Sequence, residues 1–211
     1  WIGLVGSEMC IRDRAMIDGT GEYGGVFRHV IGGRPEGWNW LAGQHQGWGG
    51  INITLQECLV RQGPLWQVKP EEQNGPLPNL AKSWSWNANK TSLTMNLVEG
   101  VKWSDGEPFD AEDLRFWWED NVQDEKVTSR MPKDGMGVGT SMSVVDPYTI
   151  RFDFKEPQGP ARVSALAYIQ GCPGPSHILK DHHPRYNPQK SYEDYKNAQP
   201  ADDLKNIVSL G

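Results

Sequence analysis

The amino-acid sequence predicts a mixed α/β fold, in which β-hairpins and short helices follow one another along the chain. Residues 80–98 and 141–154 each contain two runs of alternating apolar and polar residues around a turn, which is the pattern of a β-hairpin. Between them, residues 110–121 repeat apolar residues at helical spacing behind a capping signal. The order is therefore mixed β and α, and no long-range repeat is visible.

The first part of the chain is expected to hold one strand and one helix. Residues 23–31 alternate two sets of side chains and predict a strand. A loop rich in Gly and Trp follows over residues 32–50, and loops of this length are commonly functional. Residues 51–61 predict a helix, because one helical face would carry Ile51, Leu55, Cys58 and Leu59.

The clearest hairpin joins residues 80–87 to residues 91–98. Trp84 and Trp86 alternate with serines in the first strand, and every second residue of the other strand is apolar. Residues 88–90 supply the turn. This pattern predicts a hairpin with one buried face.

Asp110 is the predicted N-cap of the best-specified helix. Asp113 completes a variant capping box, and Phe109 and Leu114 occupy the hydrophobic-staple positions. Acids in the first turn also suit the positive end of the helix dipole. The side chains expected on the buried face are Leu114, Trp117, Trp118 and Asn121.

Further elements are predicted toward the C-terminus. Residues 141–146 and 148–154 form a second hairpin pattern around Asp146-Pro147. Residues 160–169 predict a short helix, and residues 176–181 another. The apolar side chains in step on the second hairpin are Ile150, Phe152 and Phe154.

Composition and charge exclude several classes. The 211 residues suit one domain, or one and a part. The net charge of −6 and the lack of a basic block argue against a nucleic-acid surface. No apolar run approaches the ~20 residues of a membrane span. Ten Trp against five Phe suit a cleft for mixed polar and apolar ligands, although most of the ten are expected to fill core space.

No metal site is expected. An EF-hand loop opening at Asp105 would place Phe116 where an acid is required. Adjacent His182 and His183 point in different directions on a short helix, and we expect them in a solvated loop. Metal-ligand spacing is also missing from the cysteines, whose pairing the sequence leaves open: Cys10, Cys58 and Cys172.

No catalytic constellation or cofactor motif is expected to function either. A G-x-G-x-x-G pattern precedes a predicted strand, whereas a dinucleotide site needs it between a strand and a helix. Nucleophile elbows and P-loops are missing. We therefore expect neither enzyme activity nor a cofactor. The glycines of the pattern are Gly19, Gly21 and Gly24.

The two ends of the chain differ from its middle. Residues 1–14 follow no pattern of the rest and resemble translated adapter sequence from metagenomic gene predictions, so we expect a non-native tail. Residues 15–22 are expected to be a flexible lead-in, and residues 23–211 the folded part. Because the chain stops after a short amphipathic pattern, we expect a fragment.

Several spaced motifs resemble those of the bacterial extracellular solute-binding proteins of family 5, the peptide-, dipeptide- and nickel-binding receptors of ABC importers. Residues 76–122 carry the pattern P-x-LA-x-SW, a hairpin and then GVKWSDG-x-PF-x-A-x-D. Residues 23–28, 143–152 and 175–179 resemble the family's opening strand and two later stretches. Val26-Phe27 and the Trp-rich first loop depart from it. The matching positions are Leu80, Ala81, Ser83, Trp84, Gly100 to Gly106, Pro108, Phe109, Ala111 and Asp113.

The resemblance implies a two-lobed fold of the type II periplasmic-binding-protein kind, of which this chain supplies the N-terminal part of lobe one. It implies a substrate-binding component that captures a solute, with an oligopeptide or dipeptide-like ligand expected, and delivers it to a membrane ABC permease. A periplasmic or extracellular location follows, and a lipid anchor is compatible with it. The full-length protein is expected to be monomeric.

The expected ligand-binding residues lie in the loop after the first strand and in the segment after the predicted helix at 160–169. Ligands of α/β folds collect at loops near strand ends. An alternative is a carbohydrate-binding or glycoside-processing module, which also uses exposed Trp, but catalysis there needs two carboxylates facing across a cleft. A structural surface protein without a closable cleft is a further alternative. The candidate residues are Trp38, Asn39, Trp40, Tyr168 and Gln170.

Overall fold

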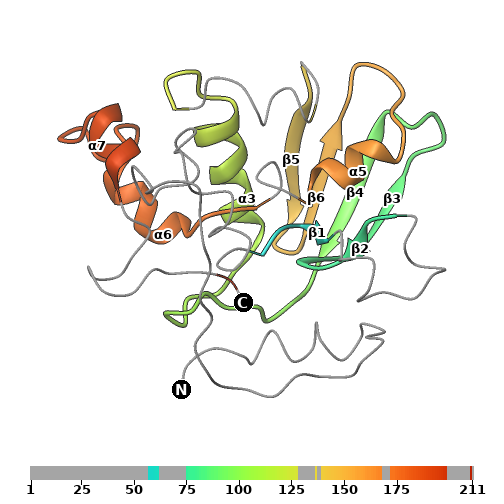
Figure 1. Ribbon diagram of the computed structural model, residues 1–211, viewed down its shortest axis with the longest axis horizontal. Coiled ribbons are helices and arrows are strands. Elements are labelled where there is room, and N and C mark those ends of the chain that lie inside the picture. The colour runs from blue at the N-terminus through green and yellow to red at the C-terminus, as the bar shows by residue number, and fades with distance from the viewer. Residues whose placement is uncertain are drawn as a thin grey trace, which may run out of the picture.

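A four-stranded antiparallel sheet is the centre of the computed structural model, which describes residues 57–61, 75–127, 136, 139–167, 172–198 and 210. The strand order is β3-β4-β6-β5. Helix α3 (Ala111–Phe116) lies beside β5, and α6 (Ser176–Leu179) and α7 (Tyr192–Asn197) lie beyond it (Figure 1). The predicted mixed α/β class is confirmed.

The first predicted hairpin is present as β3 (Ala81–Trp86) and β4 (Ser92–Leu97). Trp84 faces Met95 across the ladder. The turn is closed by Asn87, whose Oδ1 accepts hydrogen bonds from the backbone N–H of Thr91 at 2.8 Å and of Ser92 at 3.0 Å. Lys90 has φ +57°, a left-handed conformation within this turn.

The second predicted hairpin is β5 (Ser141–Asp146) and β6 (Thr149–Asp153). The Asp146 side chain accepts a hydrogen bond from the backbone of Tyr148 at 2.9 Å and so shapes the turn. Strand β6 also pairs with β4, which places Ile150 opposite Met95 and joins the two hairpins. One face of the sheet is therefore buried, with fully covered Leu93, Met95, Leu97, Ile150 and Phe152.

Helix α3 begins as predicted. Asp110 is its N-cap, and the reciprocal capping box with Asp113 is present. The helix continues as a π-helix, η3 (Trp117–Val122). Its buried surface is wider than the predicted stripe, because α3 packs against β5 on one side and α6 on the other. The additional buried side chains are Ala111, Asp113, Phe116, Asp120 and Val122.

The predicted helix over residues 51–61 is wrong at its C-terminal end. Val60–Arg61 form strand β1, which pairs with β2 (Leu77–Pro78). Leu59 and Val60 are fully buried, and the backbone N–H of Ala81 donates to the Leu59 carbonyl at 2.8 Å. Tertiary contacts thus outweigh the helical spacing of the apolar residues. Residues 51–56, the predicted strand at 23–31, the loop at 32–50 and the segments 1–14 and 15–22 lie outside the described residues.

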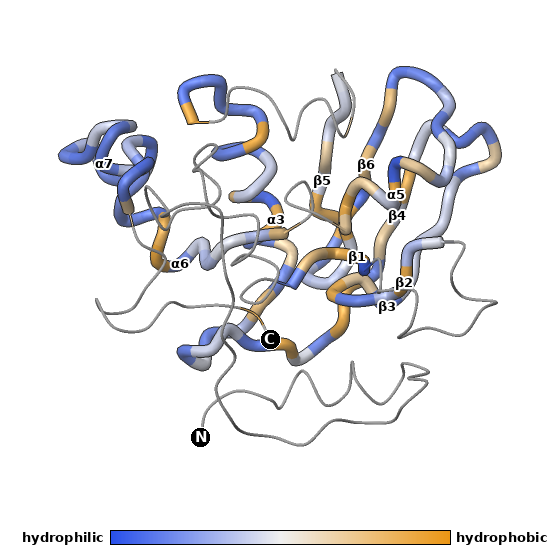
Figure 2. Tube along the Cα trace, in the orientation of Figure 1, coloured by the Kyte–Doolittle hydropathy of each residue, from blue (hydrophilic) through white to orange (hydrophobic). Residues whose placement is uncertain are grey.

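The C-terminal helices are short. The helix predicted at 160–169 is α5 (Ala161–Ala165), and that at 176–181 is α6 followed by the 3-10 turn η5 (Lys180–His182). Helix α7 is an addition; its N-cap Ser191 and Asp194 form a capping box whose spacing is readable in the sequence. Figure 2 shows α7 as mainly hydrophilic, whereas hydrophobic stretches lie along the strands of the sheet.

Candidate functional site

The side chains predicted to contact the ligand lie outside the described residues, namely Trp38, Asn39, Trp40, Tyr168 and Gln170. The structure instead describes chain on both sides of the last two, ending at Ala167 and resuming at Cys172. The candidate site is therefore described from this flanking chain.

A disulfide between Cys58 and Cys172 joins two segments that are 114 positions apart in sequence. Two residues beyond Cys58, the backbone N–H of Val60 donates to the Leu166 carbonyl at 3.5 Å. Residues 58–60 thus hold the chain both at 166 and at 172. The disulfide settles the pairing that the sequence left open.

The residues just before β3 also bond to this junction. The Cys58 carbonyl accepts a hydrogen bond from Asn79 Nδ2 at 2.7 Å and one from the backbone N–H of Leu80 at 3.4 Å. Asn79 is only 4% exposed, and its Nδ2 also donates to Glu57 Oε2 at 2.5 Å. The junction is therefore fixed by side-chain and main-chain bonds as well as by the disulfide.

Three polar side chains are grouped at the junction: Glu57, Arg61 and Asn79. Arg61 forms an ion pair with Glu57 at 3.8 Å, and both side chains remain partly exposed. The carboxylate of Glu57 and the guanidinium of Arg61 offer acceptors and forked donors, which suit ligands rich in hydroxyl groups or carrying charged ends, and the buried Asn79 amide positions Glu57. Sequence reasoning missed this group, because isolated polar residues beside a strand give no periodic signal.

Asp113 forms a second polar centre beneath the N-terminus of α3. Its Oδ2 accepts from Trp103 Nε1 at 3.1 Å, and its Oδ1 accepts from the backbone N–H of Ser176 at 3.1 Å. Burial raises the pKa of this carboxyl, and the hydrogen bonds from Ser176 and Trp103 act against that rise. The sequence indicated Asp113 only as a capping residue, whereas it also ties the loop before α3 to α6.

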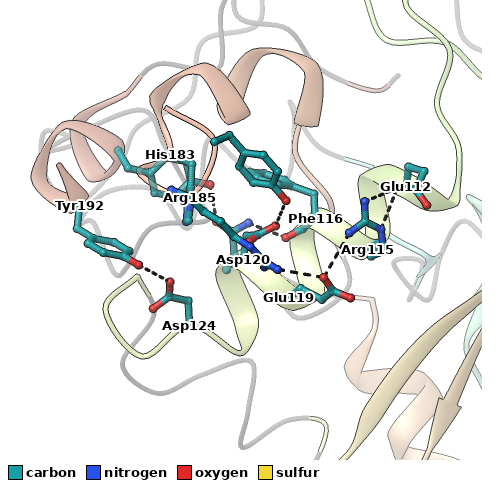
Figure 3. Close-up of polar contacts among 12 residues, drawn as sticks. Glu112, Arg115, Phe116, Glu119, Asp120, Asp124, His183, Arg185 and Tyr192 are labelled. Carbon is teal, nitrogen blue, oxygen red and sulfur yellow. Dashed lines mark hydrogen bonds and ion pairs between the residues drawn. The ribbon is translucent and has the colours of Figure 1, made fainter. Parts of the chain in front are cut away.

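A third polar centre surrounds Asp120 on η3 (Figure 3). The Asp120 carboxylate is 1% exposed and accepts from Arg185 Nη1 at 2.7 Å and from the Tyr186 hydroxyl at 2.6 Å. Burial, followed by the hydrogen bond to Asp120, raises the pKa of Tyr186 to about 12. The hydrogen bond that Arg185 itself donates to Asp120 raises the pKa of Arg185. These groups are mutually satisfied, so the centre fastens the chain near residue 185 to η3.

The expectation that His182 and His183 lie in a solvated loop is wrong for His183, which is buried. The His183 ring is 0% exposed and lies among aromatic rings, of which Tyr195 is nearest with a centroid separation of 4.6 Å. Burial lowers its pKa. The aromatic residues that surround the ring come from α3 and from residues after η5. They are far apart in the sequence, so no local pattern could have predicted that His183 is buried.

Within the described ranges, no group of three or more His, Cys, Asp or Glu side chains is placed to hold a metal ion. The part of the chain that the structure describes also contains no helix long and apolar enough to cross a bilayer.

Comparisons with known proteins identify related sequences. A family profile described as "Bacterial extracellular solute-binding proteins, family 5 Middle" matches residues 75–211. The chain is 53% identical over 198 residues to a periplasmic alpha-galactoside-binding protein of Rhizobium meliloti, a match that covers 93% of this chain and 28% of that protein.

Solved structures show the same similarity. The periplasmic binding protein MelB of Agrobacterium fabrum, in complex with stachyose, superposes with a TM-score of 0.76 at 50% identity, over 86% of this chain and 27% of MelB. An oligopeptide-binding protein, OppA, gives a TM-score of 0.61 at 30% identity, over 77% of this chain and 26% of OppA. The chain thus spans less than a third of the length of each of these relatives.

Proposed function

The chain belongs to family 5 of the bacterial extracellular solute-binding proteins, and from this premise we propose that it forms part of the substrate-binding component of an ABC importer. In this function a solute is captured between two lobes, and its differential affinity for the closed arrangement favours closure. The loaded protein then delivers the solute to a membrane permease. No bond of the solute is made or broken.

An α-galactoside oligosaccharide is the proposed ligand. The observation that carries it is the pair of relatives with half or more of the residues identical, of which one is named for α-galactoside binding and the other is in complex with stachyose. The peptide ligand expected from the sequence motifs is supported by a less similar relative, OppA, at 30% identity. The oligosaccharide therefore comes first, and a peptide is the second candidate.

The chemistry of the chain suits an oligosaccharide. Trp side chains offer flat apolar surfaces with one polar N–H, and the sequence has ten of them. At the junction, the partly exposed side chains of Glu57 and Arg61 supply the acceptors and forked donors that pairs of hydroxyl groups require, and buried Asn79 holds Glu57 in place. We propose that this junction and the five predicted residues, Trp38, Asn39, Trp40, Tyr168 and Gln170, contribute to one ligand-binding region.

A periplasmic location fits the disulfide. Disulfides persist in oxidising compartments such as the periplasm and are rare in the cytosol. The Cys58–Cys172 bond therefore supports the location that the name of the Rhizobium meliloti relative states for that protein.

Ligand class is tested by a thermal-shift panel on the protein expressed from its complete reading frame. Stachyose is expected to raise the melting temperature in a concentration-dependent way, because a ligand that binds only the folded state stabilises it. Maltotetraose is the matched tetrasaccharide without galactose, and tetra-alanine is the peptide. A shift with tetra-alanine alone would overturn the oligosaccharide in favour of the second candidate.

The proposed contact at Trp40 is tested by Trp40→Ala in the same protein. Truncation of a buried aromatic anchor is expected to weaken ligand binding by about 1–3 kcal/mol. The melting temperature without ligand should stay close to that of the wild type. Unchanged binding with a lowered melting temperature would make Trp40 a packing residue instead.

A further inference from the structure

Residues 183–198, which we name the aromatic strap, are held to η3 by a row of tyrosine hydroxyls. Tyr186 donates to Asp120 Oδ2 at 2.6 Å, Tyr195 donates to Asn121 Oδ1 at 2.5 Å, and Tyr192 donates to Asp124 Oδ2 at 2.9 Å. The acceptors come from the C-terminal part of η3 and the turn after it. The attachment of the strap therefore depends on hydrogen-bond acceptors within residues 120–124.

His183 is the first residue of the strap, and Figure 3 shows it beside Asp120 of η3. Its ring is fully buried, and its Nδ1 accepts a hydrogen bond from the backbone N–H of Arg185 at 3.2 Å. The proton of the neutral ring is therefore on Nε2, which is buried. A second proton on the ring has to sit on Nδ1, where it meets the N–H of Arg185 and breaks that bond.

Some of the charged groups around His183 raise the pKa of its ring, and others lower it. The carboxylates of Asp120 and Asp124 and the backbone carbonyl of Asp120 favour a proton on the ring, whereas the cation of Arg185 opposes it. Lys180 of η5 faces the same aromatic cluster over the rings of Phe116 and Tyr186. The other titratable neighbours of the ring are the tyrosines of the strap: Tyr186, Tyr192 and Tyr195.

We propose that the aromatic strap is a pH-dependent element. When His183 is protonated at Nδ1, the strap dissociates from η3. The released state loses the Arg185 contact and exposes the ring to water, where the added charge is solvated. Among the described residues, the ring contacts of His183 come from α3 and from the strap, so we expect the sheet to stay folded while the strap opens.

The direction of the pH effect follows from linkage. Burial lowers the pKa of His183 in the closed strap, while in the open strap the ring returns toward its ordinary pKa of about 6.5. Between these two values the open state binds more protons, so the closed state loses stability as the pH falls. Opening is therefore expected to begin below about pH 6.5 and to increase by up to about tenfold per pH unit.

Native-state hydrogen exchange on the protein from its complete reading frame tests this inference. Protection factors, corrected for the intrinsic effect of pH on exchange, are compared at pH 7.5 and 5.0 for the amides of Tyr195 and Ala198 and for those of β4 and β6. The strap amides are expected to lose protection by on the order of tenfold or more, and the sheet amides to lose little.

Two variants serve as test and control. His183→Gln has no titratable ring, so its strap should show no such pH dependence, whereas His182→Gln, at the neighbouring position, should keep it. If His183→Gln does not fold, His183→Phe replaces it as the variant without a titratable ring. An NMR titration of the His183 ring in the wild type gives the midpoint pH, which strap opening should follow. Equal protection at both pH values, or loss of protection in the folded His183 variant as well, would overturn the proposal.

Discussion

A single carboxylate, Asp113, links three parts of the molecule that the sequence pattern describes separately. It caps α3, accepts the indole N–H of Trp103 and accepts the backbone N–H of Ser176 at the start of α6. The motif that resembles family 5 contains both Trp103 and Asp113. This explains in physical terms why these two residue types occur ten positions apart.

Asp113→Asn is expected to destabilise the protein by about 1–3 kcal/mol. An amide nitrogen replaces one acceptor oxygen, so one buried N–H group loses its partner. Urea unfolding of the wild type and the variant measures the loss. Asp110→Asn is the matched control, because Asn caps helices about as well as Asp, and its effect should stay within a few tenths of a kcal/mol. Equal losses at the two positions would contradict the assigned role of Asp113.

The raised pKa of Tyr186 predicts that the folded protein loses stability at alkaline pH. Its pKa in the folded state is about 12, against about 10 in the unfolded chain, so the folded state binds more protons between these values. Stability is therefore fully present below pH 10 and falls as the pH rises toward 12. Tyr192, whose pKa is raised by its hydrogen bond to Asp124, acts in the same direction. Unfolding free energies of the wild type and Tyr186→Phe between pH 9 and 12 are expected to show a shallower fall in the variant, and parallel curves would contradict this.

At the scale of elements, the hairpins and α3 were predictable because their signals are local. Alternation, turn residues and a capping box all lie within a few positions of one another. The helix predicted at 51–61 failed at Val60 because that residue pairs with Pro78 in β2. The environment of His183 was equally out of reach, since Phe116 and Tyr195 come from elements far apart in sequence. Pairings across long sequence separations leave no local pattern to read.

The β3–β4 hairpin supplies an element-scale prediction at Lys90. Its φ of +57° suits glycine and is poorly suited to a β-branched residue. Lys90→Val is expected to destabilise the protein by about 1–2 kcal/mol, whereas Lys90→Gly should be close to neutral. Chemical denaturation of the two variants makes the comparison at one position. A Gly variant less stable than the Val variant would be inconsistent with this turn.

At the scale of the whole molecule, the Cys58–Cys172 disulfide joins chain from before the sheet to chain that follows it. A cross-link across 114 positions greatly restricts the unfolded chain. The sequence contains the two cysteines but gives no signal for their pairing, because the pairing depends on how β1 and α5 come together. The candidate site shares this dependence, which is why Glu57, Arg61 and Asn79 escaped prediction.

Removal of the disulfide is expected to lower the free energy of unfolding by about 2–5 kcal/mol. The measurement compares urea unfolding of Cys58→Ser/Cys172→Ser with the parent protein, with Cys10→Ser in both so that no third thiol exchanges. A reducing agent should shift the parent toward the variant and leave the variant unchanged. Identical unfolding midpoints for the oxidised parent and the variant would show that the bond contributes no stability.

Calorimetric titration of stachyose tests the central claim, that this family 5 protein captures an α-galactoside oligosaccharide, most directly. The protein from the complete reading frame is titrated with stachyose alone and again after saturation with tetra-alanine. We expect one saturable binding event with stachyose, unchanged by the peptide. Absence of heat with stachyose together with saturable binding of tetra-alanine would contradict the account.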